Sequence, residues 1–302
     1  MSKNVLAIYF TQSGQMEDII NHFTQPLLSS AGLTLEKLRI YPATAYPFPW
    51  TTPTFFDVMP ESVITTPVEL KPLTFKEERY DLIIIGYQPW FLSPSLPISS
   101  ILQHPSFKTR LQNTPVITIS GCRNMWINAQ EKMKKLLSEA SAHLVGNIAL
   151  VDRHNNYASL VTIFYWMLTG KKDRKWGIFP RPGVSDKDIE GAAVFGETVR
   201  KHIDNNNLDD LQPALIAQQA VVIQYPLMFI ERKAGKIFSI WSRIIHGSKK
   251  RKVLLVAFKY YLLIALCVAA PIILLVDAIF FKPFLGRRIR NQVEYYQSVR
   301  SL

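Results

Sequence analysis

Short apolar runs alternate with amphipathic segments through the first part of the chain. Residues 5–10 and 80–87 are apolar on both faces of a strand, and residues 115–120 repeat this pattern. Residues 35–40 form a weaker run, and residues 143–151 form a fifth. Continuous apolar runs of this length are typical of strands that are buried on both faces of a parallel sheet. We therefore expect five such strands.

Helical patterns fall between and after these runs, over residues 15–30, 97–111, 127–142, 157–168 and 185–203. Strict alternation of strand and helix predicts an α/β fold with a doubly wound, five-stranded parallel sheet. Residues 41–75 are a long insertion rich in Pro and aromatic side chains. A segment of that length without secondary structure is usually functional. Trp50, Phe55 and Phe56 within it are candidates to wall a pocket for alkyl chains, or to cover an edge of the sheet.

The first predicted strand is joined to the first predicted helix by Thr11, Gln12, Ser13, Gly14 and Gln15. Free backbone N–H groups and the helix dipole favour an anion at such a place. Thr11 and Ser13 add hydroxyl donors, and Gly14 lets the backbone approach closely. The loop resembles the flavodoxin phosphate loop, T-x-[ST]-G-x-[ST], with Met16 in place of the last hydroxyl. It predicts phosphate binding, and the alternative is an ordinary strand-to-helix turn.

Two further loops follow predicted strands, where ligands bind in doubly wound sheets. Their candidate contacts to a flat ring are Gln88, Pro89, Trp90 and Phe91 in one loop and Gly121, Cys122, Arg123 and Asn124 in the other. The first loop resembles the ring-binding loop of flavodoxin-like NAD(P)H-quinone reductases. Together the three loops predict FMN as the cofactor of a flavodoxin-like domain. Core packing is the alternative role of Tyr87, Trp90, Phe91 and Trp126.

Two side chains are candidates for catalysis. Arg123 would stabilise a reduced anionic flavin or a substrate carboxylate, and a structural salt bridge is its alternative role. His154 follows the fifth strand with Asp152 and Arg153 and is the histidine best placed for proton transfer. The two cysteines, Cys122 and Cys267, have neither a CxxC partner nor zinc-like spacing, so we expect no disulfide framework, no metal site and a reducing compartment.

Positive charge is concentrated in the tail. The chain has a net charge of +12 over 302 residues. Residues 247–302 contain ten Lys or Arg and two acids, a net +8, whereas residues 1–246 contain 25 and 21, a net +4. A basic tail suits either nucleic acid or an anionic membrane. A long apolar run interrupts this one, which favours the membrane and argues against nucleic acid.

The tail has two parts. Residues 226–246 have the pattern of a basic interfacial helix. Residues 253–281 are then apolar except for Lys259 and Asp277, and the 17 residues 260–276 carry no charge, near the lower limit for a bilayer span. Basic clusters at both ends allow either a hairpin that bends near Pro271 or a single span. The chain thus divides into a flavin-binding domain (1–205), a linker (206–225) and a membrane anchor (226–302), at the cytoplasmic face of the inner membrane. The start of the chain, MSKNVLAIYF, is interpreted as a strand and not a signal peptide.

A more specific resemblance covers roughly residues 3–205. Residues 46–62, 86–102, 116–137, 144–156 and 168–189 resemble the bacterial dialkylresorcinol condensing enzymes, which accompany ketosynthases in clusters for dialkylresorcinols and aryl polyenes. Condensation of thioesters requires a nucleophilic Cys with His partners. Cys122 has no neighbouring His in the sequence, and His143 and His154 could approach it only through the fold. The resemblance instead implies an aromatase, in which FMN-dependent dehydrogenation of a dialkyl-cyclohexanedione gives the resorcinol.

Two alternatives remain open. The chain could be a membrane-tethered NAD(P)H-quinone reductase or electron carrier, which keeps FMN and the anchor. It could also be a non-catalytic scaffold that docks a ketosynthase on the membrane, an alternative favoured by Met16 in the phosphate loop. In the first two cases the substrate is a small hydrophobic molecule.

Overall fold

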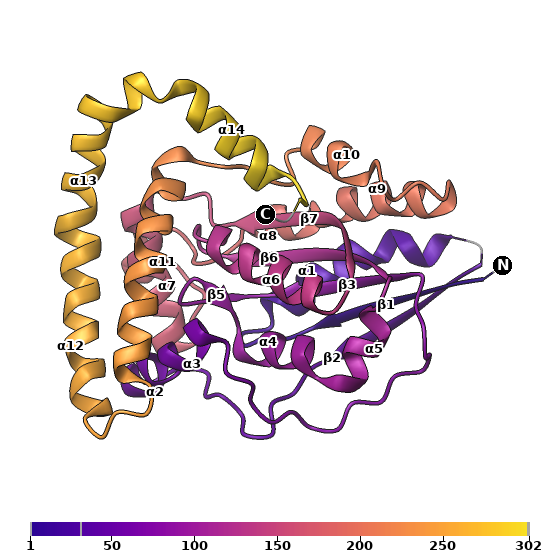
Figure 1. The fold of residues 1–302 in the computed structure, drawn as a ribbon, viewed down its shortest axis with the longest axis horizontal. Helices are drawn as coiled ribbons and strands as arrows, with labels where there is room; N and C mark the ends of the chain where they lie inside the picture. Colours follow the sequence, from indigo (N-terminus) through magenta and orange to yellow (C-terminus); the bar gives the residue numbers. More distant parts are fainter. Residues whose placement is uncertain (1, 31, 301–302) are drawn as a thin grey trace.

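A five-stranded parallel sheet forms the centre of the molecule (Figure 1). The computed structural model describes residues 2–30 and 32–300. In spatial order the strands are β2 (Leu33–Arg39), β1 (Lys3–Tyr9), β3 (Leu82–Tyr87), β6 (Pro115–Cys122) and β7 (His143–Val151). All four pairings are parallel. This order reverses direction between β1 and β3, which is the flavodoxin-like arrangement of a doubly wound sheet, and it confirms the predicted fold class.

Helices cover both faces of the sheet. One face packs against α1 (Gln15–Thr24), the 3₁₀ turn Gln25–Ser29, α8 (Asp186–Glu190), α9 (Ala192–Asp204) and α10 (Leu211–Ala217). The other packs against α4 (Leu96–Gln103), α5 (Pro105–Leu111) and α6 (Ile127–Glu139). The β3 strand has buried residues throughout. Strands with side chains buried on both faces explain why their sequences are continuously apolar.

The expected helix 97–111 is two helices that meet at His104. Proline at position 105 disfavours helical backbone in the residue before it. His104 is accordingly extended, with φ −72° and ψ 128°. α5 then starts anew with Pro105 in its first turn, where a missing N–H costs nothing.

The insertion 41–75 has more structure than expected, because it contains α2 (Thr52–Asp57) and α3 (Met59–Ile64). Thr51 begins α2 with a reciprocal capping box, in which its hydroxyl accepts from the Thr54 N–H. The residues expected to be a linker, 206–225, likewise contain α10. Leu211 and Leu215 of this helix are fully buried against the sheet, so the segment is part of the α/β body.

The C-terminal helices run along one flank of the body. α11 (Tyr225–Ile245) contacts α3 and α6. After a short turn, helical structure continues without a break from Arg251 to Phe284. It comprises α12 (Arg251–Ile264), α13 (Ala270–Val276), the π-helical segments Ala265–Ala269 and Asp277–Phe281, and the 3₁₀ turn Lys282–Phe284.

The predicted alternative of a hairpin bending near Pro271 is therefore not what the chain forms. A π-helical segment precedes Pro271, and the helix continues through it. The chain turns at Leu285 instead, and α14 (Gly286–Gln297) comes back toward β7 and α10 (Figure 1). The remaining elements are the two-residue strands β4 (Pro89–Trp90) and β5 (Ser93–Pro94), α7 (Asn156–Thr169) and the 3₁₀ turn Lys175–Gly177.

Candidate functional site

A cavity of about 180 Å³ lies beside the carboxyl ends of β1, β3 and β6. It adjoins the position where the strand order reverses, the usual ligand site in open α/β sheets. Ten of the thirteen cofactor contacts expected from the sequence line it: Gln12, Ser13, Gln15, Gln88, Pro89, Trp90, Phe91, Gly121, Cys122 and Arg123. The structure therefore brings the three predicted loops to one cavity.

The loop between β1 and α1 is shaped by Thr11 and Gly14. Thr11 is buried and does not line the cavity, and its Oγ1 accepts a hydrogen bond from the Gly14 N–H at 3.0 Å. Gly14 has φ 91°, a conformation that L-residues with a side chain rarely adopt, and no atom lies within 4 Å of where a Cβ would stand. The loop thus turns tightly and leaves open space at its tip.

The two glutamines of this loop fasten it to other segments. Gln12 Nε2 donates to the carbonyls of Tyr46 at 3.1 Å and Pro47 at 2.8 Å in the insertion. Gln15 Nε2 donates to the Val184 carbonyl at 3.2 Å, and Gln15 Oε1 accepts from the Val184 N–H at 3.3 Å. Both side chains are occupied by these bonds, so the groups left for a phosphate are backbone N–H groups and the Ser13 hydroxyl.

Met16, where the resemblance to the phosphate loop leads us to expect a hydroxyl, packs between α1 and the sheet. Its side chain is buried and also lines the cavity. A Cβ at Gly86 would lie 3.0 Å from the Met16 sulfur, and one at Gly121 would lie 2.9 Å from its methyl carbon. The two glycines therefore let α1 approach β3 and β6, and Met16 fills the space between helix and strands.

The loop after β3 forms a tight hairpin, β4–β5, whose turn has unusual residues. Phe91 and Leu92 both have positive φ, 47° and 60°. A two-residue turn of this kind favours Asn and Gly, so these positions are strained. Phe91 is held by its contact with Phe55, at 4.8 Å between ring centroids. Strain that packing maintains in this way is common at ligand sites.

Trp90 is the centre of an aromatic cluster on the same hairpin. Its ring meets Tyr46 at 5.0 Å, Trp50 at 5.5 Å and Phe10 at 5.7 Å, each edge to face. Trp50 and Phe55 from the insertion line the cavity, whereas Phe56 does not. The insertion therefore forms part of the cavity wall.

Tyr87 and Trp126, in contrast, belong to the core. Tyr87 is fully buried, and its hydroxyl donates to Gln130 Oε1 at 2.9 Å. Trp126 packs with Val221 and Met228. Core packing is thus the role of these two aromatic side chains, and Trp90 and Phe91 are the two that reach the cavity.

Cys122 and Arg123 enter the cavity from the loop after β6. Burial raises the pKa of the Cys122 thiol, which therefore stays protonated at neutral pH. Among the described residues no histidine bonds to it. His143 stands at the opposite end of β7, while Cys122 pairs with Val151 at the carboxyl end. Cys122 thus lacks the base that a condensing nucleophile requires.

Arg123 is held without an acidic partner in the described part of the chain. Its Nη1 donates to the Asn156 carbonyl at 3.0 Å, to Asn156 Oδ1 at 3.1 Å and to Ser159 Oγ at 3.4 Å. Burial lowers the pKa of the guanidinium. Asn124 lies outside the cavity lining and donates to Asn156 Oδ1 at 2.7 Å. Arg123 thus brings a positive charge to the cavity with no ion pair among the described residues, although the charge of the buried Asp152 also acts on it.

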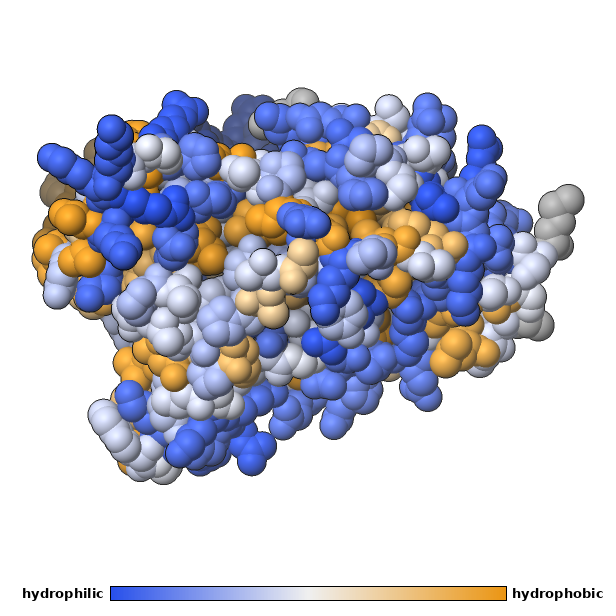
Figure 2. All heavy atoms as spheres, turned by 90° about the horizontal axis from the view of Figure 1, so that it is seen from below, coloured by the Kyte–Doolittle hydropathy of each residue, from blue (hydrophilic) through white to orange (hydrophobic). Residues whose placement is uncertain are grey.

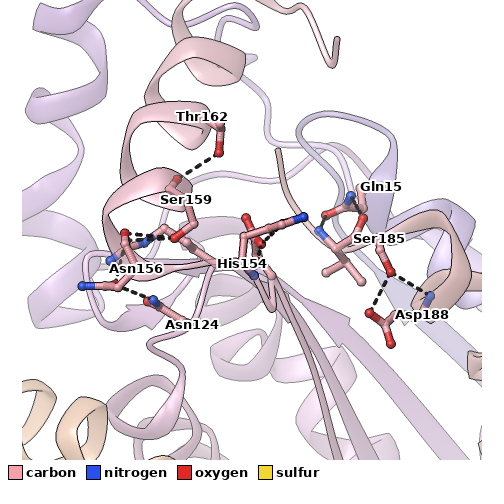
Figure 3. A network of polar contacts seen from close by, with 11 residues as sticks. Gln15, Asn124, His154, Asn156, Ser159, Thr162, Ser185 and Asp188 are labelled. Atoms are coloured by element: carbon pink, nitrogen blue, oxygen red, sulfur yellow. Dashed lines mark hydrogen bonds and ion pairs between the residues drawn. The ribbon is translucent and has the colours of Figure 1, made fainter. Parts of the chain in front are cut away.

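His154 does not reach the cavity. Its Nδ1 lies 2.7 Å from Asp152 Oδ1, and its backbone N–H donates to the same oxygen at 2.9 Å. In Figure 3 it lies between the Asn124–Asn156–Ser159 network and the Gln15–Ser185 side. Since His154 is absent from the lining, the structure does not bring it to the other predicted site residues.

Sequence reasoning missed one side of the cavity. Ile163, Trp166 and Met167 of α7 line it, with Phe48 of the insertion and Gly183. Trp166 meets Phe48 edge to face at 6.3 Å. The one signal in the sequence was the apolar character of α7, which has few polar side chains on any face. That pattern alone does not distinguish a core helix from a cavity wall.

Comparison with known proteins identifies similar folds. No protein-family profile and no curated protein matches the chain. A flavoprotein in complex with FMN from Lactobacillus acidophilus is 15% identical, with a TM-score of 0.38 over 49% of this chain and 93% of that one. Oxidised flavodoxin 1 from Bacillus cereus is also 15% identical, with a TM-score of 0.34 over 66% and 98%. A flavodoxin from the domain Archaea is 10% identical, with a TM-score of 0.37 over 67% and 99%.

Proposed function

We propose that the chain is an FMN-dependent oxidoreductase that acts on a small hydrophobic substrate. The observation that carries this proposal is the cavity itself. It lies where doubly wound sheets of this strand order bind FMN, and three strand-end loops that supply aromatic walls and Arg123 line it.

The loop after β1 suits the phosphate end of the cofactor. It leads into the N-terminus of α1, where backbone N–H groups and the helix dipole favour an anion. Glu17 and Asp18 in the first turn would oppose this, but the Glu17 carboxylate is paired with Arg39 at 2.9 Å and the Asp18 side chain is exposed to solvent. The open space at Gly14 and the Ser13 hydroxyl complete a site for the phosphate without the hydroxyl that Met16 replaces.

The aromatic side suits the flavin ring. Trp90, Phe91 and Trp166 provide flat apolar surfaces that exclude water from a ring placed between them. Arg123 would lie at a polar edge of the ring, where its charge favours the reduced, anionic form. Asn156 and Ser159 hold its guanidinium in position.

When bound, FMN supplies hydride acceptance. For the substrate, the resemblance to the dialkylresorcinol enzymes favours a dialkyl-cyclohexanedione, which becomes aromatic by losing two hydrogens. One would leave as a hydride to the flavin and the other as a proton to water. The electrons would pass on to an acceptor such as a membrane quinone or dioxygen. Because the Cys122 thiol is protonated, it is a poor nucleophile, which supports a flavin-dependent dehydrogenation over a condensation.

A quinone reductase is the second candidate, and a specific contact favours it. The cavity residue Phe91 lies 6.4 Å, between ring centroids, from Phe258 of the apolar helix α12. A site that adjoins this apolar helix suits a lipid-soluble quinone. In both candidates the chain binds FMN and associates with a membrane. A ketosynthase is a proposed protein partner in either case.

The first test is the visible spectrum of the purified full chain, with the released cofactor identified. We expect flavin bands, FMN in the supernatant, and weaker binding by about three- to tenfold in Trp90→Ala. Trp176→Ala is the matched control, because Trp176 is 75% exposed and outside the cavity. A colourless protein that does not take up added FMN would overturn the proposal and leave the scaffold.

The second test separates the two substrates. The FMN-loaded chain is offered a dialkyl-cyclohexanedione, and resorcinol formation is followed by mass. In parallel it is offered NAD(P)H and a quinone. Resorcinol formation with no quinone reduction supports the aromatase, and the reverse result supports the reductase.

A further inference from the structure

The helical stretch Arg251–Phe284 presents apolar side chains to the outside. An 18-residue window within it has a mean hydropathy of 2.8 and is only 6% buried, so by length and composition it could cross a membrane. Up to residue 272 its exposed side chains are spaced by three or four residues and include Val253, Val256, Tyr260, Ile264, Val268 and Ile272. This spacing marks an apolar stripe, which widens beyond it because Ile273, Leu275, Val276, Ile279, Phe280 and Phe281 are exposed as well. Figure 2 shows hydrophobic residues at this end of the molecule, and others in a band across its middle.

The opposite face of this stretch packs against the protein. Phe258 is fully buried, with its ring 5.3 Å from Phe238 of α11 and 6.2 Å from Phe56 of α2. Leu255 belongs to the same cluster. α11 and the insertion therefore keep lipid from one side of α12, whereas α13 has no buried residue.

The first turn of the helix is tied to the insertion. Arg251 Nε donates to Asp57 Oδ1 at 2.8 Å, and its two terminal nitrogens donate to the two Glu61 carboxylate oxygens at 2.7 Å each. His246 adds a contact to Glu61 at 3.3 Å. The bidentate geometry fixes the start of the helix on the α/β body.

The far end of the helix is tied to the same body. Asp277 is buried within the apolar stretch and accepts a hydrogen bond from the Tyr225 hydroxyl at 2.9 Å, which connects it to the start of α11. Beyond the turn, the Tyr295 hydroxyl donates to Glu131 Oε2 at 2.7 Å, and the Gln297 carbonyl accepts from Gln212 at 2.7 Å. Both ends are thus held by one folded unit.

These ties decide how the helix meets a bilayer. The 34 residues extend about 51 Å, longer than the hydrocarbon core of about 30 Å. If the helix crossed the bilayer with its contacts intact, α11 and the flank of the body would enter hydrocarbon with Arg232, Lys233 and Lys236. Charged groups in that position are costly. A helix lying flat keeps every contact and still buries the stripe.

We propose that Arg251–Phe284 lies in the plane of one leaflet of an anionic membrane, with the whole α/β body on that side. Charge selects lipid over a second copy of the chain as the occupant. Lys249, Lys250 and Lys252 stand at one end, and Arg287, Arg288 and Arg290 follow the other. Two copies packed through this stripe would bring basic ends together in either orientation. Anionic headgroups neutralise both ends at one depth.

The first test maps the sidedness of both ends of the helix. Single cysteines are placed by Lys249→Cys, Asn291→Cys and, on the body, Glu78→Cys, in full chains in which Cys122 and Cys267 are replaced by Ser. A membrane-impermeant thiol reagent is applied to inverted membrane vesicles from cells that express each chain. We expect all three sites to react from the same side. Reaction of Asn291→Cys from the side opposite to the other two would establish a crossing helix and overturn the proposal.

The second test measures depth along the helix. A fluorophore on the native Cys267, or on Val256→Cys or Ile279→Cys in chains without other cysteines, is quenched by lipids labelled at known depths. The vesicles contain phosphatidylethanolamine and phosphatidylglycerol. The flat helix predicts one shallow depth for all three, whereas a crossing helix places Cys267 deeper by about 15 Å. A chain that does not bind vesicles and instead forms a dimer that can be cross-linked through Cys267 would also overturn the proposal. Neither test depends on FMN.

Discussion

Two apolar segments of similar composition differ in burial in this molecule, since one is fully buried and the other has no buried residue. The β3 strand, Leu-Ile-Ile-Ile-Gly-Tyr, is buried at every position. The α13 helix, Ala-Pro-Ile-Ile-Leu-Leu-Val, has no buried residue. β3 has partner strands on both sides and helices on both faces, whereas α13 satisfies its own backbone hydrogen bonds and has a protein neighbour on one side. Apolar composition therefore indicates that a segment avoids water, and the partners around it decide what replaces the water.

The sharpest way to break this comparison is to place the same charge in each segment. Ile84→Asp puts a carboxylate at a fully buried position in β3, and we expect a loss of about 4 kcal/mol or more in the free energy of unfolding. Ile272→Asp alters a position that is 56% exposed, and we expect a change within about 0.5 kcal/mol. Thermal and urea unfolding measure both.

In a vesicle-binding assay we expect the larger effect from Ile272→Asp, the variant with the smaller effect on stability. Ile272→Asp should weaken binding of the full chain to anionic vesicles by about tenfold or more, because it opposes burial of the stripe. Equal loss of stability in the two variants would show that α13 is buried by protein in solution and would contradict the comparison.

The second effect lies at the seam between the body and α11. Glu231 is buried, and its Oε1 accepts from the Asn128 N–H at 2.7 Å. Burial raises the pKa of Glu231 to about 7 from 4.5, although backbone hydrogen bonds from Asn128, Ile127 and Trp126 oppose the rise. The folded chain then binds the proton more tightly than the unfolded chain. The stabilisation that this proton gives the folded chain is fully present below the pKa of Glu231 in the unfolded chain. It is lost as pH rises through the pKa in the folded chain.

The expected magnitude is about 3 kcal/mol between about pH 4.5 and about pH 7. Glu231→Gln should remove this part of the pH dependence, because an amide does not titrate. The amide oxygen can still accept the Asn128 N–H, so the packing at this position is kept. Urea unfolding of both chains across that range measures it. A variant with the same pH slope as the parent would exclude Glu231 as the source.

A smaller effect tests the tie at the start of α12. Arg251→Lys keeps the charge but loses the fork that bridges Asp57 and Glu61, so we expect the first turns of α12 to lose about 1–2 kcal/mol of protection from hydrogen exchange. Arg243→Lys, an exposed position on α11, is the matched control. Exchange that is unchanged in Arg251→Lys would show that the aromatic cluster alone holds the helix.

The same tie has a pH dependence of the opposite sign to Glu231. Burial raises the pKa of Glu61, but hydrogen bonds from Arg251 outweigh it, and the pKa lies below its ordinary value. The stabilisation is therefore present above the unfolded pKa and is lost as pH falls through the folded value.

The smallest effect concerns the basic residues beside the stripe. Lys250→Ala should weaken binding to vesicles that contain phosphatidylglycerol by about 1 kcal/mol, and added salt should reduce the difference. Lys76→Ala, an exposed change on the α/β body, serves as the control. Equal effects of the two variants would show that net charge, and not the position at the stripe, attracts the lipid.

Local patterns predicted the regular elements well. The apolar runs gave the correct strands, because burial on both faces leaves a direct trace in composition. The break at His104 could also be found, since Pro105 restricts the residue before it. The insertion was harder to interpret, because its helices α2 and α3 are six residues each and depend on packing.

The candidate site divides in the same way. The loops after β1, β3 and β6 were predictable, since the carboxyl ends of parallel strands meet at one edge. His154 was placed by its distance from β7 along the chain, and the structure turns it to Asp152. The α7 side of the cavity was not predictable, because its contact with Phe48 joins residues more than a hundred positions apart.

By itself, the sequence determined which segments avoid water, how the strands and helices alternate, and where glycine and hydroxyl groups follow strand ends. These properties depend on spacing along the chain, which sets the face that each side chain occupies. Only the tertiary structure decided that Phe91 is held at positive φ by Phe55, that Arg123 has no acidic partner among the described residues, and that the apolar helix is tied at both ends to one body. Such contacts join distant segments, and they exist only when the packing of the whole body brings those segments together.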